Sequence, residues 1–367
     1  MYTAKISGVG HFVPEHIVTN TDLSQLMDTN DEWITERTGI RERRWVEKGD
    51  GNTAATMGIK AARKALASAG IEASDIDHIV FATISPDYYF PGCGVQVQEA
   101  LDIHTAGATD VRNACSGFIY AMSVATAFVQ SGMHENVLVV ASELQSPFLD
   151  KTTRGRGVSV IFGDGAGAAV VSRGTELDRG IMSCHTHSQG KHKEELTMKG
   201  FGTQHWLDEY DAEGLKPEIH FPQMNGNFVF KNAVVRFGEV IGEALAANQM
   251  TPDQIDCLIP HQANLRIAQF IQKRMKLRDD QVFNNIQKYL PLNVVAVDTT
   301  LSVLLSAPNF VATASAKDFK LSASTEDPLT VNGGYAVSHP TIRAEAKTSS
   351  KSLTEPDTED TLPKVIF

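Results

Sequence analysis

A cysteine and a histidine, half a chain apart, occupy the positions best suited to covalent chemistry. Cys115 lies in the stretch 110–118 (DVRNACSGF), between an apolar stretch and helical sequence. A thiol at a helix N-terminus lies near unpaired backbone N–H groups and the positive end of the helix dipole. We therefore expect a depressed pKa and an exposed, nucleophilic sulfur. The alternative interpretation is a buried cysteine that packs as a small hydrophobic residue.

His261 is the candidate partner in the second half of the chain. It lies in the stretch 258–264 (LIPHQAN), where a short apolar strand ends and a helix over 265–275 is predicted to begin. Open α/β sheets bind ligands at the carboxyl ends of their strands, so we expect Cys115 and His261 to meet there. A neutral imidazole at this place can donate to a thioester oxygen or accept a proton. A surface histidine after a strand is the alternative.

Alternating helices and strands are predicted to position these two residues. Apolar spacing indicates helices over 53–69 and 117–130 and buried strands over 79–82 and 137–141, with Gly70 ending the first helix. Continuous apolar strands between helices are typical of a largely parallel sheet that is covered on both faces.

The chain also contains an internal echo. Three short stretches recur without gaps 179 residues later: Ala65-Leu66-Ala67, Ile76-Asp77 and Ile79-Val80 align with Ala244-Leu245-Ala246, Ile255-Asp256 and Leu258-Ile259. One short echo can arise by chance, but this one spans a helix, a turn and a strand. It therefore predicts an α/β fold of two similar halves.

Composition excludes several classes of protein. The 367 residues carry a net charge of -11, which argues against a nucleic-acid binder that depends on phosphate neutralisation. The four cysteines are far apart and form no CxxC, so we expect neither a disulfide framework nor a structural zinc site, and a reduced compartment. The sequence contains neither a charged leader before an apolar core nor an apolar run long enough for a membrane span. We therefore expect a cytoplasmic protein.

Two further patterns suggest ligands but match none well. Cys184, His185, His187 and His192 lie close together in sequence, yet their spacing fits no closed tetrahedral site, and we predict no metal. The glycine-rich stretch 162–167 (FGDGAG) lacks the lysine of a P-loop and a Rossmann context. Its glycines are better explained by a tight turn beside the active site.

Six stretches together carry a resemblance to a known family: Gly8-Val9-Gly10, 31–40 (DEWITERTGI), 114–118 (ACSGF), 162–166 (FGDGA), 225–227 (NGN) and 260–264 (PHQAN). Between Ile6 and Tyr289 the chain resembles β-ketoacyl-acyl-carrier-protein synthase III, the condensing enzyme that starts type II fatty-acid synthesis. The resemblance implies a thiolase-like five-layered fold of two similar α/β halves and a homodimer. It also implies acyl-CoA and malonyl-acyl carrier protein as substrates, with no cofactor.

The resemblance assigns roles to individual residues. Cys115 would take the acyl group from acyl-CoA as a thioester, and His261 would stabilise the enolate oxygen that develops as the malonyl group loses CO₂. The implied binding residues are Trp33, Arg37 and Arg156 for CoA, Gly226, Asn227 and Asn264 for the substrate tunnel, Arg266 for the carrier protein and Phe90 for acyl length across the dimer. Without the family match, these would be interpreted as core or solvated side chains.

The resemblance stops after Tyr289. The family continues with Gly-Asn-Thr, whose asparagine is the third catalytic residue, whereas this chain continues Leu290-Pro291-Leu292-Asn293. A faint candidate for the family's later glycine-rich turn is 332–335 (NGGY). Residues 290–367 contain 19 Ser and Thr but only two Gly, which argues against a continuing copy of the fold. A shifted reading frame and genuine divergence both explain this change.

We therefore expect an N-terminal half at 1–175, a C-terminal half at 176–345 that is atypical from 290, and a disordered tail at 346–367. The leading functional hypothesis is a decarboxylating Claisen condensation of an acyl-CoA primer with malonyl-carrier protein. One alternative is a related condensing enzyme with another acyl acceptor. Another is an impaired or frame-shifted relative that only acylates Cys115 or binds a partner.

Overall fold

The fold is that of a computed structural model, which describes residues 2–174, 180–203 and 217–287. It also describes five short strands: β11 (Leu321–Ser324), β12 (Leu329–Val331), β13 (Tyr335–Val337), β14 (Thr341–Ala344) and β15 (Val365–Ile366). The expected boundary at 175–176 lies outside the described residues. Most of the predicted tail at 346–367 does too.

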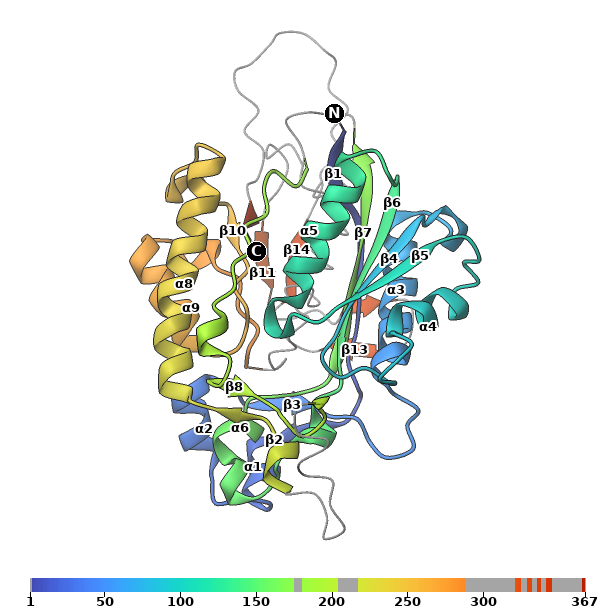
Figure 1. Cartoon of the computed structure of the whole chain (residues 1–367). Coiled ribbons are helices and arrows are strands. Elements are labelled where there is room, and N and C mark those ends of the chain that lie inside the picture. Colours follow the sequence, from blue (N-terminus) through green and yellow to red (C-terminus); the bar gives the residue numbers. More distant parts are fainter. Residues whose placement is uncertain are drawn as a thin grey trace.

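A five-stranded mixed sheet forms the centre of the described N-terminal part (Figure 1). Its order is β1-β7-β6-β4-β5, with bounds β1 (Thr3–Phe12), β7 (Gly165–Gly174), β6 (Asn136–Glu143), β4 (His78–Ala82) and β5 (Gly107–Val111). β4 pairs in parallel with β5 and β6, whereas β7 is antiparallel to both of its neighbours. The expected parallel sheet is therefore interrupted by one reversed strand.

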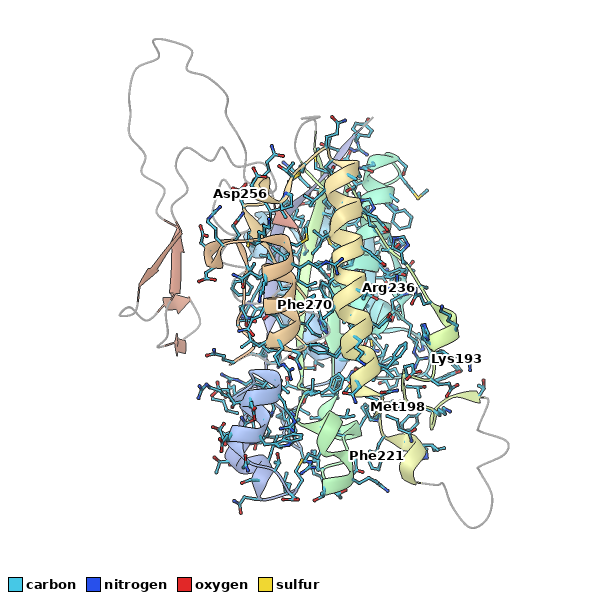
Figure 2. The ribbon with its side chains drawn as sticks, turned by 90° about the vertical axis from the view of Figure 1, so that its left-hand side faces the viewer. Lys193, Met198, Phe221, Arg236, Asp256 and Phe270 are labelled. Carbon is cyan, nitrogen blue, oxygen red and sulfur yellow. The ribbon has the colours of Figure 1, made fainter. Side chains whose placement is uncertain are left out.

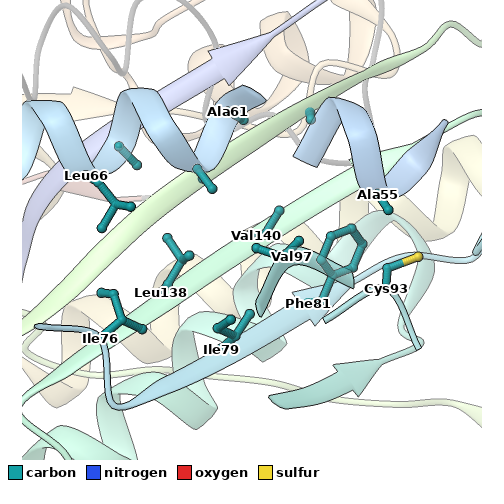
Figure 3. Packing of buried hydrophobic residues seen from close by; sticks show 14 of the residues in the cluster. Ala55, Ala61, Leu66, Ile76, Ile79, Phe81, Cys93, Val97, Leu138 and Val140 are labelled. Atoms are coloured by element: carbon teal, nitrogen blue, oxygen red, sulfur yellow. The ribbon is translucent and has the colours of Figure 1, made fainter. Parts of the chain in front are cut away.

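One face of this sheet is covered by α3 (Ala54–Ala69) and α4 (Cys93–Ala100). Alanines give α3 a narrow buried face that lies against leucine, isoleucine and phenylalanine side chains of β4 and β6 (Figure 3). β1 and α3 approach each other so closely that a Cβ on Gly8 of β1 would lie 2.3 Å from the Ala69 nitrogen. Glycine is thus required where β1 and α3 touch.

The opposite face carries α5 (Gly117–Gln130), which packs against alternate residues of β6. Cys257 and Ile259 from the second part of the chain join the same buried cluster. α5 therefore lies between the sheet and β10 (Cys257–Leu258), as Figure 1 shows. Beyond β10 lie α8 (Gly226–Ala247) and α9 (Leu265–Met275), whose apolar faces share a separate cluster. The succession helix, sheet, helix, strand, helix agrees with the expected layered fold.

Smaller elements form a base next to these layers. They are β2 (Ile17–Thr19), α1 (Asn20–Ser24), α2 (Asp31–Thr38), β3 (Glu42–Arg44), α6 (Arg156–Ser159), β8 (Leu196–Thr197) and β9 (Gln223–Met224). Arg43 is fully buried here and donates to the carbonyls of Val18 and Val160 and to the Asn20 side chain. These bonds satisfy a buried charge and connect β2 and β3 to α6.

The internal echo corresponds to repeated local structure. In the first copy, α3 is followed by a 3₁₀ turn at Ala73–Asp75 and by β4; in the second, α8 is followed by Pro252–Gln254 and β10. Gly70 and its equivalent Gln249 both have left-handed φ values, +66° and +53°. The predicted helices and strands of both copies are confirmed. In the described parts of the chain, no helix is both long and apolar enough to cross a membrane.

Candidate active site

Cys115 lies in the turn that joins β5 to α5, at the carboxyl edge of the sheet. A 3₁₀ turn at Ala114–Ser116 leads directly into α5, and Ala114 has a left-handed φ of +47°. A non-glycine residue in this region is strained, and such strain concentrates at functional sites. The expected position at a helix N-terminus is confirmed.

The expected thiolate, in contrast, is wrong for the resting protein. Burial by the surrounding protein, and then the nearby Glu143 carboxyl, raise the pKa of the partly exposed Cys115 thiol to about 11. The residue's own backbone N–H donates to the sulfur, but this contribution is outweighed. Desolvation disfavours the charged form of a thiol. Cys115 is therefore a neutral thiol until a ligand or base changes its surroundings.

His261 follows β10 in the short connection to α9. Burial lowers the pKa of its imidazole to about 4, so the ring is neutral at neutral pH, as expected. The connection is held by its neighbour Gln262, whose amide donates to the Pro260 carbonyl and accepts from the Asn285 backbone N–H. This network fixes the backbone on which the imidazole is mounted.

The segments that carry the two residues converge on one core. Phe118, three residues after Cys115, and Ile259, two residues before His261, belong to the same buried cluster. Both candidates therefore occupy short connections that adjoin this cluster, Cys115 at the N-terminal end of α5 and His261 after β10. This arrangement suits a nucleophile and a neutral hydrogen-bonding group that act on one substrate.

The three residues expected to bind CoA form one cluster. The Arg37 guanidinium lies 4.5 Å from the Trp33 ring centroid, and that of Arg156 lies 4.8 Å from it. Arg156 also donates to the Asp28 carbonyl at 2.5 Å, which connects the start of α6 to the loop before α2. An aromatic ring with two guanidinium groups close to it can stack a flat base and contact phosphates.

Asn264 has a structural role beyond the expected tunnel position. Its side-chain oxygen accepts from the Arg266 backbone N–H at the start of α9, and its amide nitrogen donates to the Arg37 carbonyl at 3.0 Å. The loop that carries His261 is thereby attached to α2. Gly226 and Asn227 are exposed in the first turn of α8.

Two predicted partner-facing residues are exposed. Phe90 is 81 % exposed, next to exposed Tyr88 and Tyr89 in the loop before α4. Arg266 is exposed at the start of α9, and its guanidinium lies 5.5 Å from the Phe230 ring of α8. Figure 2 shows the face of α8 and α9 that presents Arg236 and Phe270.

The histidines once considered as metal ligands contact α8 instead. The Nε2 atom of His187 lies 2.6 Å from Glu243, His185 lies 3.7 Å from the same carboxylate, and the His192 ring lies against Phe228. Among the described residues, no three His, Cys, Asp or Glu side chains are grouped to hold a metal ion. The departure from the family at 290–293 lies outside the described residues, and so does the candidate glycine-rich turn at 332–335 except for Tyr335, which begins β13.

One residue at this edge of the sheet was missed from sequence. Glu143 ends β6, is 2 % exposed and contributes to the electrostatic environment of Cys115. The available signal was a carboxyl at the end of an otherwise apolar strand, because such a group is rarely buried without a purpose.

Comparisons with known proteins identify the family of the chain. Family models of the two parts of 3-oxoacyl-[acyl-carrier-protein] synthase III match residues 109–190 and 245–304, the second continuing past Tyr289. A β-ketoacyl-[acyl-carrier-protein] synthase III of Shigella flexneri is 42% identical over 303 residues, 82% of this chain and 90% of the relative. The corresponding protein of Pseudoalteromonas atlantica is 39% identical over 300 residues, 81% of this chain and 89% of the relative.

Solved structures give the same result. The crystal structure of 3-oxoacyl-[acyl-carrier-protein] synthase III from Aquifex aeolicus has a TM-score of 0.73 at 35% sequence identity. The match covers 81% of this chain and 89% of the Aquifex aeolicus chain. The Thermus thermophilus enzyme has a TM-score of 0.74 at 32% identity, covering 82% and 90%.

Proposed function

Because the chain belongs to the β-ketoacyl-[acyl-carrier-protein] synthase III family, we propose that it catalyses a decarboxylating Claisen condensation. An acyl-CoA would supply the primer, and malonyl-acyl carrier protein would supply the two-carbon unit. The product would be a 3-oxoacyl-carrier protein, the first intermediate of fatty-acid synthesis. The observation that carries this proposal is that neighbours of both residues, Phe118 and Ile259, belong to one buried cluster.

The chemistry has two stages on this site. The sulfur of Cys115 attacks the acyl-CoA carbonyl, CoA leaves as a thiol, and the acyl group stays as a thioester. The malonyl thioester then loses CO₂, and the resulting carbanion attacks the acyl carbonyl, which breaks the thioester bond and releases the Cys115 sulfur. A neutral His261 donates a hydrogen bond to the oxygen on which enolate charge develops.

Other surfaces support the binding of both substrates. The Trp33 ring and the guanidinium groups of Arg37 and Arg156 suit the nucleotide end of CoA. Arg266 suits an acidic carrier protein, and Gly226, Asn227 and Asn264 would line the path between. The exposed aromatic residues around Phe90 would be covered in a homodimer. Two soluble substrates are consistent with a cytoplasmic enzyme that needs no cofactor.

Acylation by acetyl-CoA or octanoyl-CoA tests the first stage. Intact-mass analysis should detect one acyl adduct on the wild type and none on Cys115→Ala. Cys184→Ala is the matched control, because it removes an exposed cysteine outside the site and should leave the adduct in place. No adduct with either thioester would contradict the proposal.

A second candidate, an impaired relative that only acylates Cys115, is favoured by the sequence at 290–293, which lacks the family's Gly-Asn-Thr. Loss of one hydrogen-bond donor to a developing oxyanion costs about 2.7–4 kcal/mol in comparable sites. Release of CO₂ from malonyl-carrier protein separates the two candidates. Rapid release, dependent on His261, supports condensation, whereas an acyl adduct without CO₂ release supports the impaired relative.

A further inference from the structure

Glu143 lies on the same face of the sheet as the Cys115 turn. Side chains alternate along β6, and Val137, Val139 and Ala141 all belong to the cluster that packs against α5. Glu143 continues this series, so its carboxyl is directed to the α5 side. In register, Ala82 of β4 lies opposite both Ala141 and Val111. The ends of β6 and β5, which lead to Glu143 and Cys115, are therefore only one strand apart.

The carboxyl of Glu143 is held by three donors. Its Oε1 accepts from the Ile84 backbone N–H at 3.0 Å, and its Oε2 accepts from Ser85 Oγ and Gln145 Nε2, both at 2.8 Å. The group is 2 % exposed, so no rotation exchanges these bonds for bulk water. It connects the loop after β4 to the end of β6, and β4 in turn supports the Cys115 turn, since a Cβ on Gly117 would lie 3.2 Å from Ala82 Cβ.

The charges around this carboxyl are mostly acidic. The charge of Glu143 acts on the Cys115 thiol in the turn after β5 and on the Cys93 thiol at the start of α4. Asp87 and Asp110 adjoin Cys93, and Asp164, ahead of β7, accepts from the Gln145 backbone N–H. Arg112 is the cation that acts on Glu143, and it contributes less than burial does. Burial raises the pKa of Glu143 to about 7, against an ordinary 4.5.

We propose that Glu143 is a positioning residue that acts through Cys115, because the ionisation of its carboxyl is coupled to that of the Cys115 thiol. Each anion makes formation of the other less favourable. The reactivity of the thiol therefore depends less steeply on pH. The inference rests on the proposed role of Cys115 as the nucleophile. While Glu143 is protonated, each rise of one pH unit increases the thiolate tenfold. Once Glu143 ionises, its charge disfavours the thiolate, and the two groups titrate as a pair rather than separately.

This coupling has a defined signature. Just above the pKa of Glu143, the proton that the pair loses comes from the carboxyl. Cys115 must then ionise next to the negative charge of Glu143, which makes the thiolate less favourable. The thiolate population therefore stays nearly constant until the pH has risen by the size of the coupling. The enzyme would keep a steady thiolate fraction over the range in which an isolated thiol changes most steeply.

Iodoacetamide alkylation of Cys115, measured between pH 6 and 9 by peptide mass spectrometry, tests the proposal on the intact protein. In the wild type the logarithm of the rate should rise with pH and level off above about pH 7. Glu143→Gln keeps the side chain's size but cannot ionise, so its rate should rise without a plateau. At pH 8 the variant should be alkylated about three- to tenfold faster than the wild type.

Glu135→Gln is the matched control, since Glu135 directly precedes β6, at the opposite end from Glu143, and is paired with Arg173 at the surface. It should retain the plateau. A wild-type profile that rises linearly through pH 7–8 would overturn the proposal, even if Glu143→Gln does not fold, and so would a plateau that persists in that variant. Iodoacetamide measures the thiol directly, so this result is separate from the acyl-CoA adduct that tests the function.

Discussion

The two copies of the helix–turn–strand unit share a local geometry but differ in what they bury. In the first copy, α3 buries eight residues on its 16-residue length, against β4 within the five-stranded sheet. In the second, α8 buries three residues on 22, and β10 pairs with the two-residue β15. The same sequence pattern thus produces the same turn and strand in both copies, although the two helices bury very different numbers of residues.

The difference shows that the residues that specify a helix or a turn do not also determine how deeply that element is buried. Capping residues and apolar spacing specify the helix, the turn and the start of the strand in both copies. The depth of burial depends on the sheet that receives the unit, which its own sequence does not determine. Stability should therefore be distributed unevenly between the two parts, and matched substitutions measure that difference.

The largest expected effect comes from removing equivalent strand residues. Ile79 and Leu258 occupy corresponding positions in β4 and β10 and are 0% and 1% exposed. Ile79→Ala should lower the free energy of unfolding by about 3–4 kcal/mol, because the strand is fixed by neighbours on both sides and the cavity cannot collapse. Leu258→Ala should cost about 2–3 kcal/mol, because the shorter strand can relax. Urea denaturation measures both, and equal losses would contradict the comparison.

A smaller effect concerns pH and the residue that follows β10. The pKa of His261 is about 4 in the folded protein and 6.5 ordinarily, so the unfolded chain binds more protons between these values. Stability should therefore fall as the pH drops from 6.5 to 4, by about 1–2 kcal/mol from this partly exposed group. His261→Gln should lose that share of the slope in denaturation measured at each pH.

Glu143, at the end of β6, supplies a contrast of opposite sign. Its folded pKa of about 7 exceeds the ordinary 4.5, so its contribution is fully present below pH 4.5 and is lost as the pH rises through 7. Glu143→Gln should therefore remove a decline of stability over pH 4.5–7. Identical pH dependence in the two variants would contradict the assigned shifts.

The smallest effect tests the turn that both copies share. Gly70 and Gln249 are exposed and have left-handed backbones, and a Cβ on Gly70 meets nothing within 4 Å. Gly70→Ala should cost about 1 kcal/mol through strain alone, and Gln249→Gly should stabilise by about 0.5–1 kcal/mol. Thermal unfolding detects both. Effects of the same sign would show that the two turns are not equivalent.

Periodicity was sufficient to predict the elements around the candidate site. The helix over 54–69, its end at Gly70, the strand 78–82 and the helix 117–130 all depend on contacts within a few residues. The reversed strand β7 was not predicted, because its direction depends on pairing with β1, which starts 162 residues earlier in the chain. Strand order is a property of distant partners and leaves no local pattern.

The same limit explains the error at Cys115. Its place before a helix was readable from 110–118, and so was the expectation of a helix-dipole effect. Its raised pKa comes from desolvation and from Glu143, 28 residues further along the chain. Electrostatic environments are assembled from separate strands, so the residue types indicated the chemistry while the fold determined the protonation state.

The hydrogen bond from Asn264 to the Arg37 carbonyl helps to fix the distance between two parts of the candidate site. It joins the helix that carries the Trp33 ring to the loop that carries His261, and the Arg41 backbone N–H reinforces the joint by donating to the Gln287 carbonyl. In the proposed function, a ligand bound at Trp33 would meet His261 at a distance that this hydrogen bond helps to fix. The length of the linker between the two ends of such a ligand, rather than its chemistry, would then decide whether it fits.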